Sequence, residues 1–578
     1  MRYEAKAHKG IYAAALAATV ARVVLAALTP VRCVTYAGYD DGLMLGYAQS
    51  LAGGAWLGQY TRFTLVKNPG YAMILAFSAF AHIRYQVVFM LLWAVACAVA
   101  ARALEPLVRD ARVRLGIYLA LLWTPVFFMY EFFERTYRSG IVMPFVLGIF
   151  AGYFGLYLRR DRPARQLAPW AVLAGLTLAY FYLIMESSAW VLPFVIVCSL
   201  VLCILWVLDL RQGRLALRGL AARLLLLALP LAMLWGWTSL EAKANGHFYG
   251  IRLNNVRTQG SYSQVLGRLA SIDTGETNPD IVISRAALEQ AFAASPTFAQ
   301  AQDTVWTSWD TWAAGYTSWD KPEGSKEVPG DIGFWALMDG YEAAFGYANP
   351  QDPERFWAQV CGELDAAFAD GRLQHKPGLA LSPGTQPVTA ADVAPWLAES
   401  LASGGRIALY QPDTRMVGFY PVEEKGDAAV IQAQLRARDF LGGNSTVDDP
   451  GDALYIRTRG FVAAEAAVGH ALLWVYRALA LASVVAAAWL VYQDKKDVNE
   501  KNLDGRRTAL LVAALLLSAF ALIAGVVWAE GFFMRQDPQL HGLSVSMYAG
   551  ASYILFAYAE CILVGRAVGR LKAAGESD

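Results

Sequence analysis

The stretch IYAAALAATVARVVLAAL, residues 11–28, is long and apolar enough to cross a bilayer as one helix, and Arg22 is its only charge. It is followed by Thr-Pro-Val-Arg-Cys rather than by a small-residue cleavage site, so we interpret it as a retained anchor. Similar runs recur along the 578 residues, 56% of which are hydrophobic, and the mean hydropathy is +0.35. A soluble chain of this length is seldom so apolar. The sequence therefore predicts a polytopic α-helical membrane protein.

Basic residues gather in five short segments, at 109–114, 159–165, 211–223, 494–507 and 566–572. Loops rich in Lys and Arg stay on the cytoplasmic side of a membrane. Placing all five segments and Met1 on that side predicts a multi-pass protein of the cell membrane with both termini in the cytoplasm. The ten predicted spans lie near 10–29, 85–104, 114–131, 140–158, 168–185, 189–209, 221–239, 466–492, 508–529 and 544–566.

One apolar segment, 69–83, does not fit this topology as a span. It has about 15 residues, whereas a crossing helix needs about 20. If it crossed, every later basic segment would face outward. We therefore expect an interfacial or re-entrant helix at this position.

The topology divides the chain into three parts. Residues 1–240 form a transmembrane module with a first external loop at 30–84, residues 241–462 form an extracytoplasmic domain, and residues 463–578 return to the membrane. The stretch 241–460 has 28 acidic and 17 basic residues, a net charge of −11, while the whole chain has +1. We expect this domain to be mixed α/β, because helix-like stretches alternate with two short β-rich runs, RIALYQ (406–411) and MVGFYPV (416–422).

The first external loop begins with two adjacent carboxylates, Asp40 and Asp41, and ends with Lys67 before an Asn-Pro-Gly turn. One interpretation is that both carboxylates cap the helix that follows them. The other is that one of them faces a water-filled cavity as a general base, its ionisation tuned by burial and by its neighbour. Successive residues point in different directions, so only one of the two is expected to reach a substrate.

The turn EFFERTYRS, residues 131–139, is predicted on the same side of the membrane as the first loop and brings Arg135 and Arg138 there. Cations beside a carboxylate form a place where a lipid-linked phosphate is held while the acid removes a proton. The alternative is that these side chains reach to lipid headgroups. We also expect Glu134 to pair with Arg138, four residues further on, at a helix end.

Together these residues resemble a known family. The pattern Asp-Asp at 40–41, Tyr-Ala-x-x-Leu-x-x-Gly at 47–54 and Lys-Asn-Pro-Gly-Tyr at 67–71 is similar to the first external loop of GT-C glycosyltransferases that use polyprenyl-phosphate sugars. Protein mannosyltransferases and the aminoarabinose transferase are examples. The resemblance implies that Asp40 is the base, Asp41 its neighbouring acid and Lys67 the phosphate-facing lysine.

The resemblance is strong over 36–72, moderate to about residue 195 and weak beyond. The turn 134–138 is similar to the Arg-containing stretch that these families place opposite the first loop. MESSAWVLP (185–193) looks like a degenerate form of a Thr-Arg-Glu-Glu-Gly-x-Trp motif in an uncharacterised bacterial subgroup. The chain departs from the pattern at Asn68, which replaces a proline, and at the third motif, which lacks its arginine.

The sequence thus favours a glycosyltransferase that moves a hexosyl or pentosyl group from a polyprenyl-phosphate donor to an extracytoplasmic lipid, polysaccharide or protein acceptor, with inversion. The donor phosphate is expected to meet Lys67, Arg138 and Arg135, with Glu134, Glu186 and Tyr47 in supporting positions. No metal-ligand motif is present, the motifs seen require no divalent metal or other cofactor, and no nucleic-acid partner is expected. Two other classes stay open: a transporter or flippase of lipid-linked sugar, and a non-catalytic envelope protein that binds glycan.

The predicted external domain contains TSWDTWAAGYTSWD at 307–320, in which Thr-Ser-Trp-Asp occurs twice. Tryptophan stacked on a sugar face beside an aspartate makes a carbohydrate platform. Trp309, Trp319 and Trp335 are therefore candidates for contact with the sugar or the acceptor. The other interpretation of these residues is a protein core or an aromatic belt at the membrane surface.

Overall fold

The computed structural model describes residues 2–34, 39–278, 280–315, 324–330, 332–379, 387–411, 414–418, 428–443, 453–496, 503–534 and 538–575. These residues form helices joined by loops, with isolated β-bridges and no strand among them. The helical part of the predicted fold class is confirmed, and the mixed α/β domain is not supported. The first half of RIALYQ (406–411) is the last turn of α16 (Val393–Ala408), because Ser400, Ser403 and Ile407 recur at helical spacing and are buried. MVGFYPV (416–422) contributes one isolated bridge, from Met416 to Met129, and continues outside the described residues.

Ten helical segments of the described chain are long and apolar enough to cross a membrane, as predicted, so the chain is a multi-pass membrane protein. They comprise α1 (Arg2–Leu28), α4 (Tyr85–Ala103), α5 (Ala111–Leu122) continued by η1 (Pro125–Phe128), α6 (Arg138–Leu158), α7 (Ala164–Ile184), η3 (Ser188–Val191) with α8 (Leu192–Arg211), α9 (Leu217–Tyr249), α18 (Ala453–Lys496), α19 (Leu503–Met534) and α21 (Ala551–Gly575). The last span begins at Ala551 rather than near 544, because α20 (Pro538–Tyr548) ends in a turn before it.

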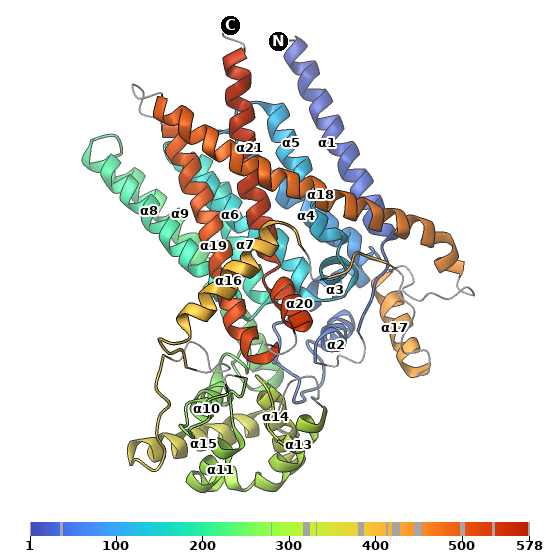
Figure 1. The fold of residues 1–578 in the computed structure, drawn as a ribbon, viewed down its shortest axis with the longest axis vertical. Helices are drawn as coiled ribbons and strands as arrows, with labels where there is room; N and C mark the ends of the chain where they lie inside the picture. The colour runs from blue at the N-terminus through green and yellow to red at the C-terminus, as the bar shows by residue number, and fades with distance from the viewer. Residues whose placement is uncertain are drawn as a thin grey trace.

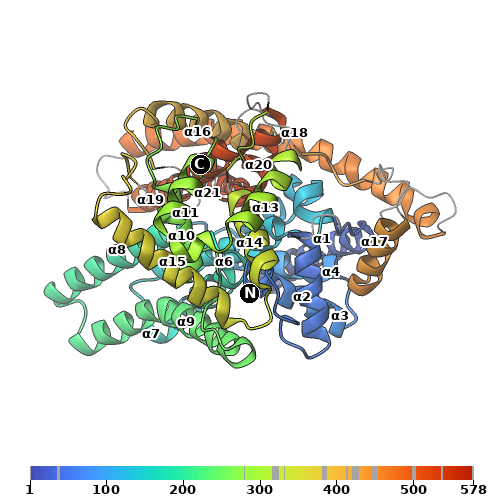
Figure 2. The same cartoon turned by 90° about the horizontal axis from the view of Figure 1, so that it is seen from below.

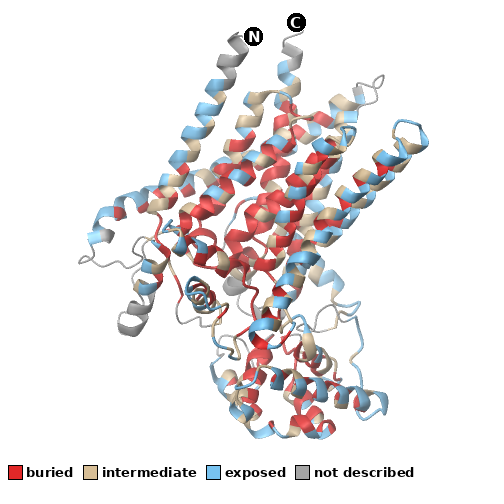
Figure 3. Cartoon of the chain, turned by 180° about the vertical axis from the view of Figure 1, so that it is seen from behind, coloured by how far each residue is buried: buried red, intermediate tan, exposed pale blue. Residues whose placement is uncertain are grey.

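The spanning helices form a bundle with α6 at its centre. Buried residues follow the middle of the bundle, whereas its outer helices carry many exposed residues (Figure 3). Leu16, Leu200, Leu225 and Val485 are among these exposed residues, as expected for surfaces that face lipid. The two ends of the chain lie at one end of the bundle, and α10–α15 lie at the other (Figure 1).

Arg22, the only charge of residues 11–28, faces the interior of the bundle. Its side chain is fully buried, forms an ion pair of 3.5 Å with Glu465 of α18 and donates a hydrogen bond of 2.7 Å to the carbonyl of Phe127. A charge in a low-dielectric interior is tolerated when it is paired in this way. The pair therefore joins the first span to the C-terminal spans.

The first external loop contains two short helices, α2 (Asp41–Ala52) and α3 (Gly70–Phe80), which pack against each other. A helix of 11 residues such as α3 is about 16 Å long, roughly half the thickness of the hydrocarbon core. It is therefore too short to cross as a straight helix, in agreement with the expectation for residues 69–83.

A second layer covers the end of the bundle away from the termini. Viewed from that end, its helices lie over the middle of the bundle (Figure 2). They are α10 (Gly260–Ala270), α11 (Arg285–Ala294), α12 (Pro296–Ala299), α13 (Gln302–Gly315), α14 (Ile332–Phe345) and α15 (Gln351–Ala369). They enclose a second hydrophobic core, to which Val66 of the first loop and Trp528 of α19 also contribute. We call α10–α15 the outer layer.

Two further helices of the 241–462 stretch, α16 and α17 (Ala428–Leu441), lie beside the bundle (Figure 1). α16 packs against α19, and Trp396 Nε1 donates a hydrogen bond of 2.6 Å to the carbonyl of Ala524 in that span. α17 contacts α3. The division of the chain at residues 241 and 462 stays a prediction.

Candidate active site

The two carboxylates at the start of the first loop serve different partners. Asp40 precedes α2 without a side-chain bond to its backbone and pairs with the ammonium of Lys67. Asp41 is fully buried, accepts a hydrogen bond of 2.9 Å from the backbone N–H of Val34 and holds Arg135 at 3.1 Å. The interpretation of both as simple helix caps is therefore wrong. Only Asp40, whose side chain is 31% exposed, is open to a ligand.

The second turn is a broken helix, which directs its two arginines to different partners. Residues 130–134 form a single π-turn, η2 (Tyr130–Glu134), Arg135 and Tyr137 are extended, and α6 begins with Arg138. Arg135 pairs back to Glu131 at 3.0 Å as well as to Asp41. Both arms of this guanidinium are thus engaged by carboxylates.

Arg138 pairs with Glu186 rather than with Glu134. One of its nitrogens lies 3.0 Å from Glu186 Oε1, and a second contacts the other carboxylate oxygen. The expected Glu134–Arg138 pair is wrong, because the extended residues between them remove the helical register that spacing by four requires. Glu134 instead accepts a hydrogen bond of 3.0 Å from the backbone N–H of Gly418.

Tyr137 joins the three cations into one cluster. Its buried ring lies 5.5 Å from Lys67 Nζ, 4.7 Å from the guanidinium of Arg135 and 5.8 Å from that of Arg138. Cations are attracted to an aromatic face at such distances. Its hydroxyl lies 3.2 Å from that of Tyr548. The sequence interpretation missed both tyrosines, and the position of Tyr137 between two arginines is the signal that could have found it.

Burial and neighbouring charges shift the pKa values of the acids in this cluster in different directions. Burial raises the pKa of Asp40, but the ammonium of Lys67, helped by Arg138 and Arg135, outweighs it and leaves that pKa below its usual range. Burial raises the pKa of Asp41 to about 6 against the pull of Arg135. For Glu186, burial is outweighed by Arg138, and the pKa falls to about 2. Asp40 and Glu186 are therefore carboxylates at neutral pH.

Tyr47 supports the loop that carries Lys67. Its buried hydroxyl donates a hydrogen bond of 2.6 Å to the carbonyl of Phe63 and accepts one of 3.1 Å from the N–H of Leu65. It thus ties α2 to the approach of the Lys67 turn, which is a structural role near the site.

Two of the three tryptophans expected to contact a sugar are covered. Trp309 is fully buried, because Val305, Trp309 and Ala313 recur every four residues on the inner face of α13. Trp335 is also buried and packs on the ring of Tyr39, 4.8 Å away, next to the paired carboxylates. The expectation of exposed sugar platforms is therefore wrong for these two residues. Trp319 lies outside the described residues.

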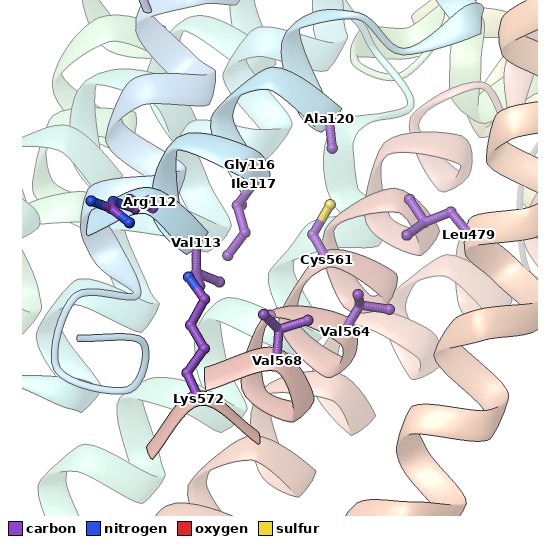
Figure 4. Close-up of a pocket in the computed structure, with 11 residues that line it drawn as sticks. Arg112, Val113, Gly116, Ile117, Ala120, Leu479, Cys561, Val564, Val568 and Lys572 are labelled. Carbon is purple, nitrogen blue, oxygen red and sulfur yellow. The ribbon is translucent and has the colours of Figure 1, made fainter. Parts of the chain in front are cut away.

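The described residues contain no group of three or more His, Cys, Asp or Glu side chains that could hold a metal. A cleft of about 340 Å³ lies elsewhere, between α5, α18 and α21. Apolar side chains such as Ile117, Val568 and Leu479 line it, with Arg112 and Lys572 at its edge (Figure 4). It shares no residue with the cluster around Tyr137.

No protein-family model and no curated protein matches the chain. Two similar solved structures are both of ArnT from Cupriavidus metallidurans. The apo structure has 14% sequence identity and a TM-score of 0.31, covering 99% of this chain and 79% of ArnT. The structure bound to undecaprenyl phosphate has 14% identity and a TM-score of 0.29, covering 98% and 78%.

ArnT is an aminoarabinose transferase of the GT-C class, the class that the first loop of this chain resembles. Identities and TM-scores this low carry no argument about the activity of this chain.

Proposed function

We propose that this protein is an integral-membrane glycosyltransferase that moves a sugar from a polyprenyl-phosphate donor to an acceptor outside the cytoplasm. The observation that supports it best is the meeting of the partly exposed Asp40 with Lys67 and Arg138 beside one ring, Tyr137. Asp40 lies at the outer-layer end of the bundle, since its neighbour Tyr39 packs on Trp335 of α14.

The ion pair with Lys67 allows the basicity of Asp40 to increase when the donor binds. A phosphate placed beside Lys67 and Arg138 would draw the ammonium away from Asp40. Because that ammonium holds the pKa of Asp40 low, its partial neutralisation makes the carboxylate a stronger base. Donor binding would thus prepare the acid for the proton transfer.

The reaction is a single displacement. Asp40 accepts the proton of an acceptor hydroxyl, whose oxygen forms a bond to the anomeric carbon while the bond from that carbon to the phosphate oxygen breaks. The electron pair leaves with the polyprenyl phosphate, whose charge Lys67 and Arg138 stabilise. One displacement inverts the anomeric configuration. Two cations at the phosphate supply charge neutralisation that a divalent metal would otherwise provide, and lipid, polysaccharide and protein acceptors all present a suitable hydroxyl.

Asp40→Asn tests the proposal in the full chain reconstituted in lipid nanodiscs. Radiolabelled polyprenyl-phosphate hexose and pentose are the donors, a membrane extract supplies the acceptor, and transfer of label is measured. Loss of a general base costs about 10²- to 10⁴-fold in rate, so we expect at least a hundredfold loss from a protein that still folds, with the unfolding temperature lowered only by the loss of the ion pair with Lys67. Asp303→Asn, which alters an exposed carboxylate of α13, is the control.

Wild-type transfer by a correctly folded Asp40→Asn protein would rule out the assigned base. Movement of the labelled lipid across vesicles without release of sugar would favour a transporter instead.

A further inference from the structure

The turn that carries Lys67 is held from outside by the chain that leads into the outer layer. Asn255, in the connection between α9 and α10, is 2% exposed. Its amide nitrogen donates hydrogen bonds of 3.2 Å to the carbonyl of Val66 and 2.9 Å to Asn68 Oδ1, the residues on either side of Lys67. Its side-chain oxygen, Oδ1, accepts a hydrogen bond of 2.8 Å from the N–H of Arg257.

Two further hydrogen bonds hold the same turn, and together with the bonds of Asn255 they form what we call the clamp. The N–H of Val256 donates to the carbonyl of Leu65 at 2.9 Å, and Asn68 Nδ2 donates to the carbonyl of Tyr182 at 2.7 Å. Leu65 has a φ of +63°, which is costly for a residue with a side chain and persists only with support from its surroundings. The Lys67 turn is therefore strained and depends on partners outside itself.

The clamp also accounts for the departure of this chain from the proline of the family pattern. Asn68 uses both ends of its amide, one toward Asn255 and the other toward the end of α7. A proline at this position has no side-chain amide and could make neither bond.

On the basis of the proposed function, we infer that Asn255 is a positioning residue that sets Lys67 for the donor phosphate. Lys67 has a long side chain, of which 4% is exposed. Small shifts of its backbone therefore move the ammonium relative to Asp40. Asn255 touches no reacting atom and acts through the turn. The same connection places the guanidinium of Arg257 4.8 Å from the ring of Phe334 in α14, which links the clamp to the outer layer.

Asn255→Ala and Asn254→Ala form a matched pair for the test. Asn254 is the adjacent residue and also makes side-chain hydrogen bonds, but these go to the carbonyl of Thr238 and to Glu241 of α9, away from the Lys67 turn. The full chain in nanodiscs is titrated with polyprenyl phosphate alone, and the unfolding temperature is recorded for each variant.

We expect Asn255→Ala to weaken polyprenyl phosphate binding about three- to tenfold, the effect of a lost buried hydrogen bond. The donor KM should rise by a similar factor with a smaller change in kcat. Asn254→Ala should bind as wild type does. Asn68 and Asn255 share one hydrogen bond. A variant with both residues replaced should therefore weaken polyprenyl phosphate binding by less than the product of the factors measured for the two single variants.

The outcomes separate the inference from the proposed function. If Lys67→Ala weakens polyprenyl phosphate binding while Asn255→Ala binds it as well as Asn254→Ala does, the positioning role is wrong and the proposed function stands. If Lys67→Ala itself binds polyprenyl phosphate as wild type does, the phosphate site is wrong and both fail.

Discussion

The acidity of Asp40 is decided by opposing forces at one side chain. Burial favours the neutral acid, while the ammonium of Lys67 and the more distant Arg138 and Arg135 favour the carboxylate and prevail. An acid whose pKa is lowered on folding stabilises the fold above its ordinary pKa. That stability is lost as the pH falls through the lower, folded value. The ion pair thus keeps the proposed base ionised well into acidic solution.

Lys67→Met should therefore move the acidic limb of the pH profile. Methionine keeps a chain of similar length without the charge, so the pKa of Asp40 rises and the carboxylate is lost at a higher pH. We expect kcat/KM, which reports the free enzyme, to fall at a higher pH in the variant than in wild type, in addition to an overall loss.

Arg62→Met is the control for this measurement. Arg62 also belongs to the first loop, but it pairs with Asp339 at 2.8 Å and with Glu342 of α14. Its removal should leave the acidic limb in place. If Lys67→Met leaves the limb in place too, Asp40 is not the group that titrates in the profile.

At the scale of elements, the junction of η2 and α6 determines where the arginines point. The extended backbone of Arg135 and Tyr137 turns Arg135 toward Asp41 and leaves Arg138 to begin α6 beside Glu186. Gly140 allows this close approach, because a Cβ on it would overlap the carbonyl oxygen of Phe132 in η2. The glycine is needed for space.

Gly140→Ala should displace η2 from α6 and so separate the two arginine pairs. Overpacking against a backbone atom costs about 1 to 3 kcal/mol, and we expect a lower unfolding temperature together with weaker polyprenyl phosphate binding. Gly116→Ala in α5, where a Cβ meets nothing within 4 Å, should leave both quantities at wild-type values. If the two variants have the same unfolding temperature and bind polyprenyl phosphate equally well, the junction does not depend on Gly140.

These elements also show what the sequence could and could not predict. The spans followed from apolar runs of membrane length, since hydropathy depends on composition alone. The partners of the charged residues could not be predicted without the path of the backbone. Spacing by four suggests a Glu134–Arg138 pair, but the extended residues after η2 break the helix between them. RIALYQ (406–411) looked like a strand, because a run of six residues is too short to distinguish alternation from one buried helical turn.

At the scale of the whole molecule, the proposed chemistry lies at one end of the bundle. The outer layer covers that end and the chain termini lie at the other (Figure 1). The basic segments of the sequence predict that the termini are cytoplasmic. The site would then open to the outside, where nucleotide-sugars are absent and a lipid-linked donor is required.

Labelling of single introduced cysteines tests this orientation. Asp303→Cys lies on an exposed turn of α13 in the outer layer, and Gln212→Cys lies on the exposed connection between α8 and α9. In right-side-out membrane vesicles, a membrane-impermeant maleimide should label position 303 directly and position 212 only after permeabilisation, with the wild-type chain as the background from its six cysteines. The opposite pattern would place Asp40 and Lys67 on the cytoplasmic side. Soluble nucleotide-sugars would be available there, and the reason for a polyprenyl-phosphate donor would be lost even if Asp40→Asn were inactive.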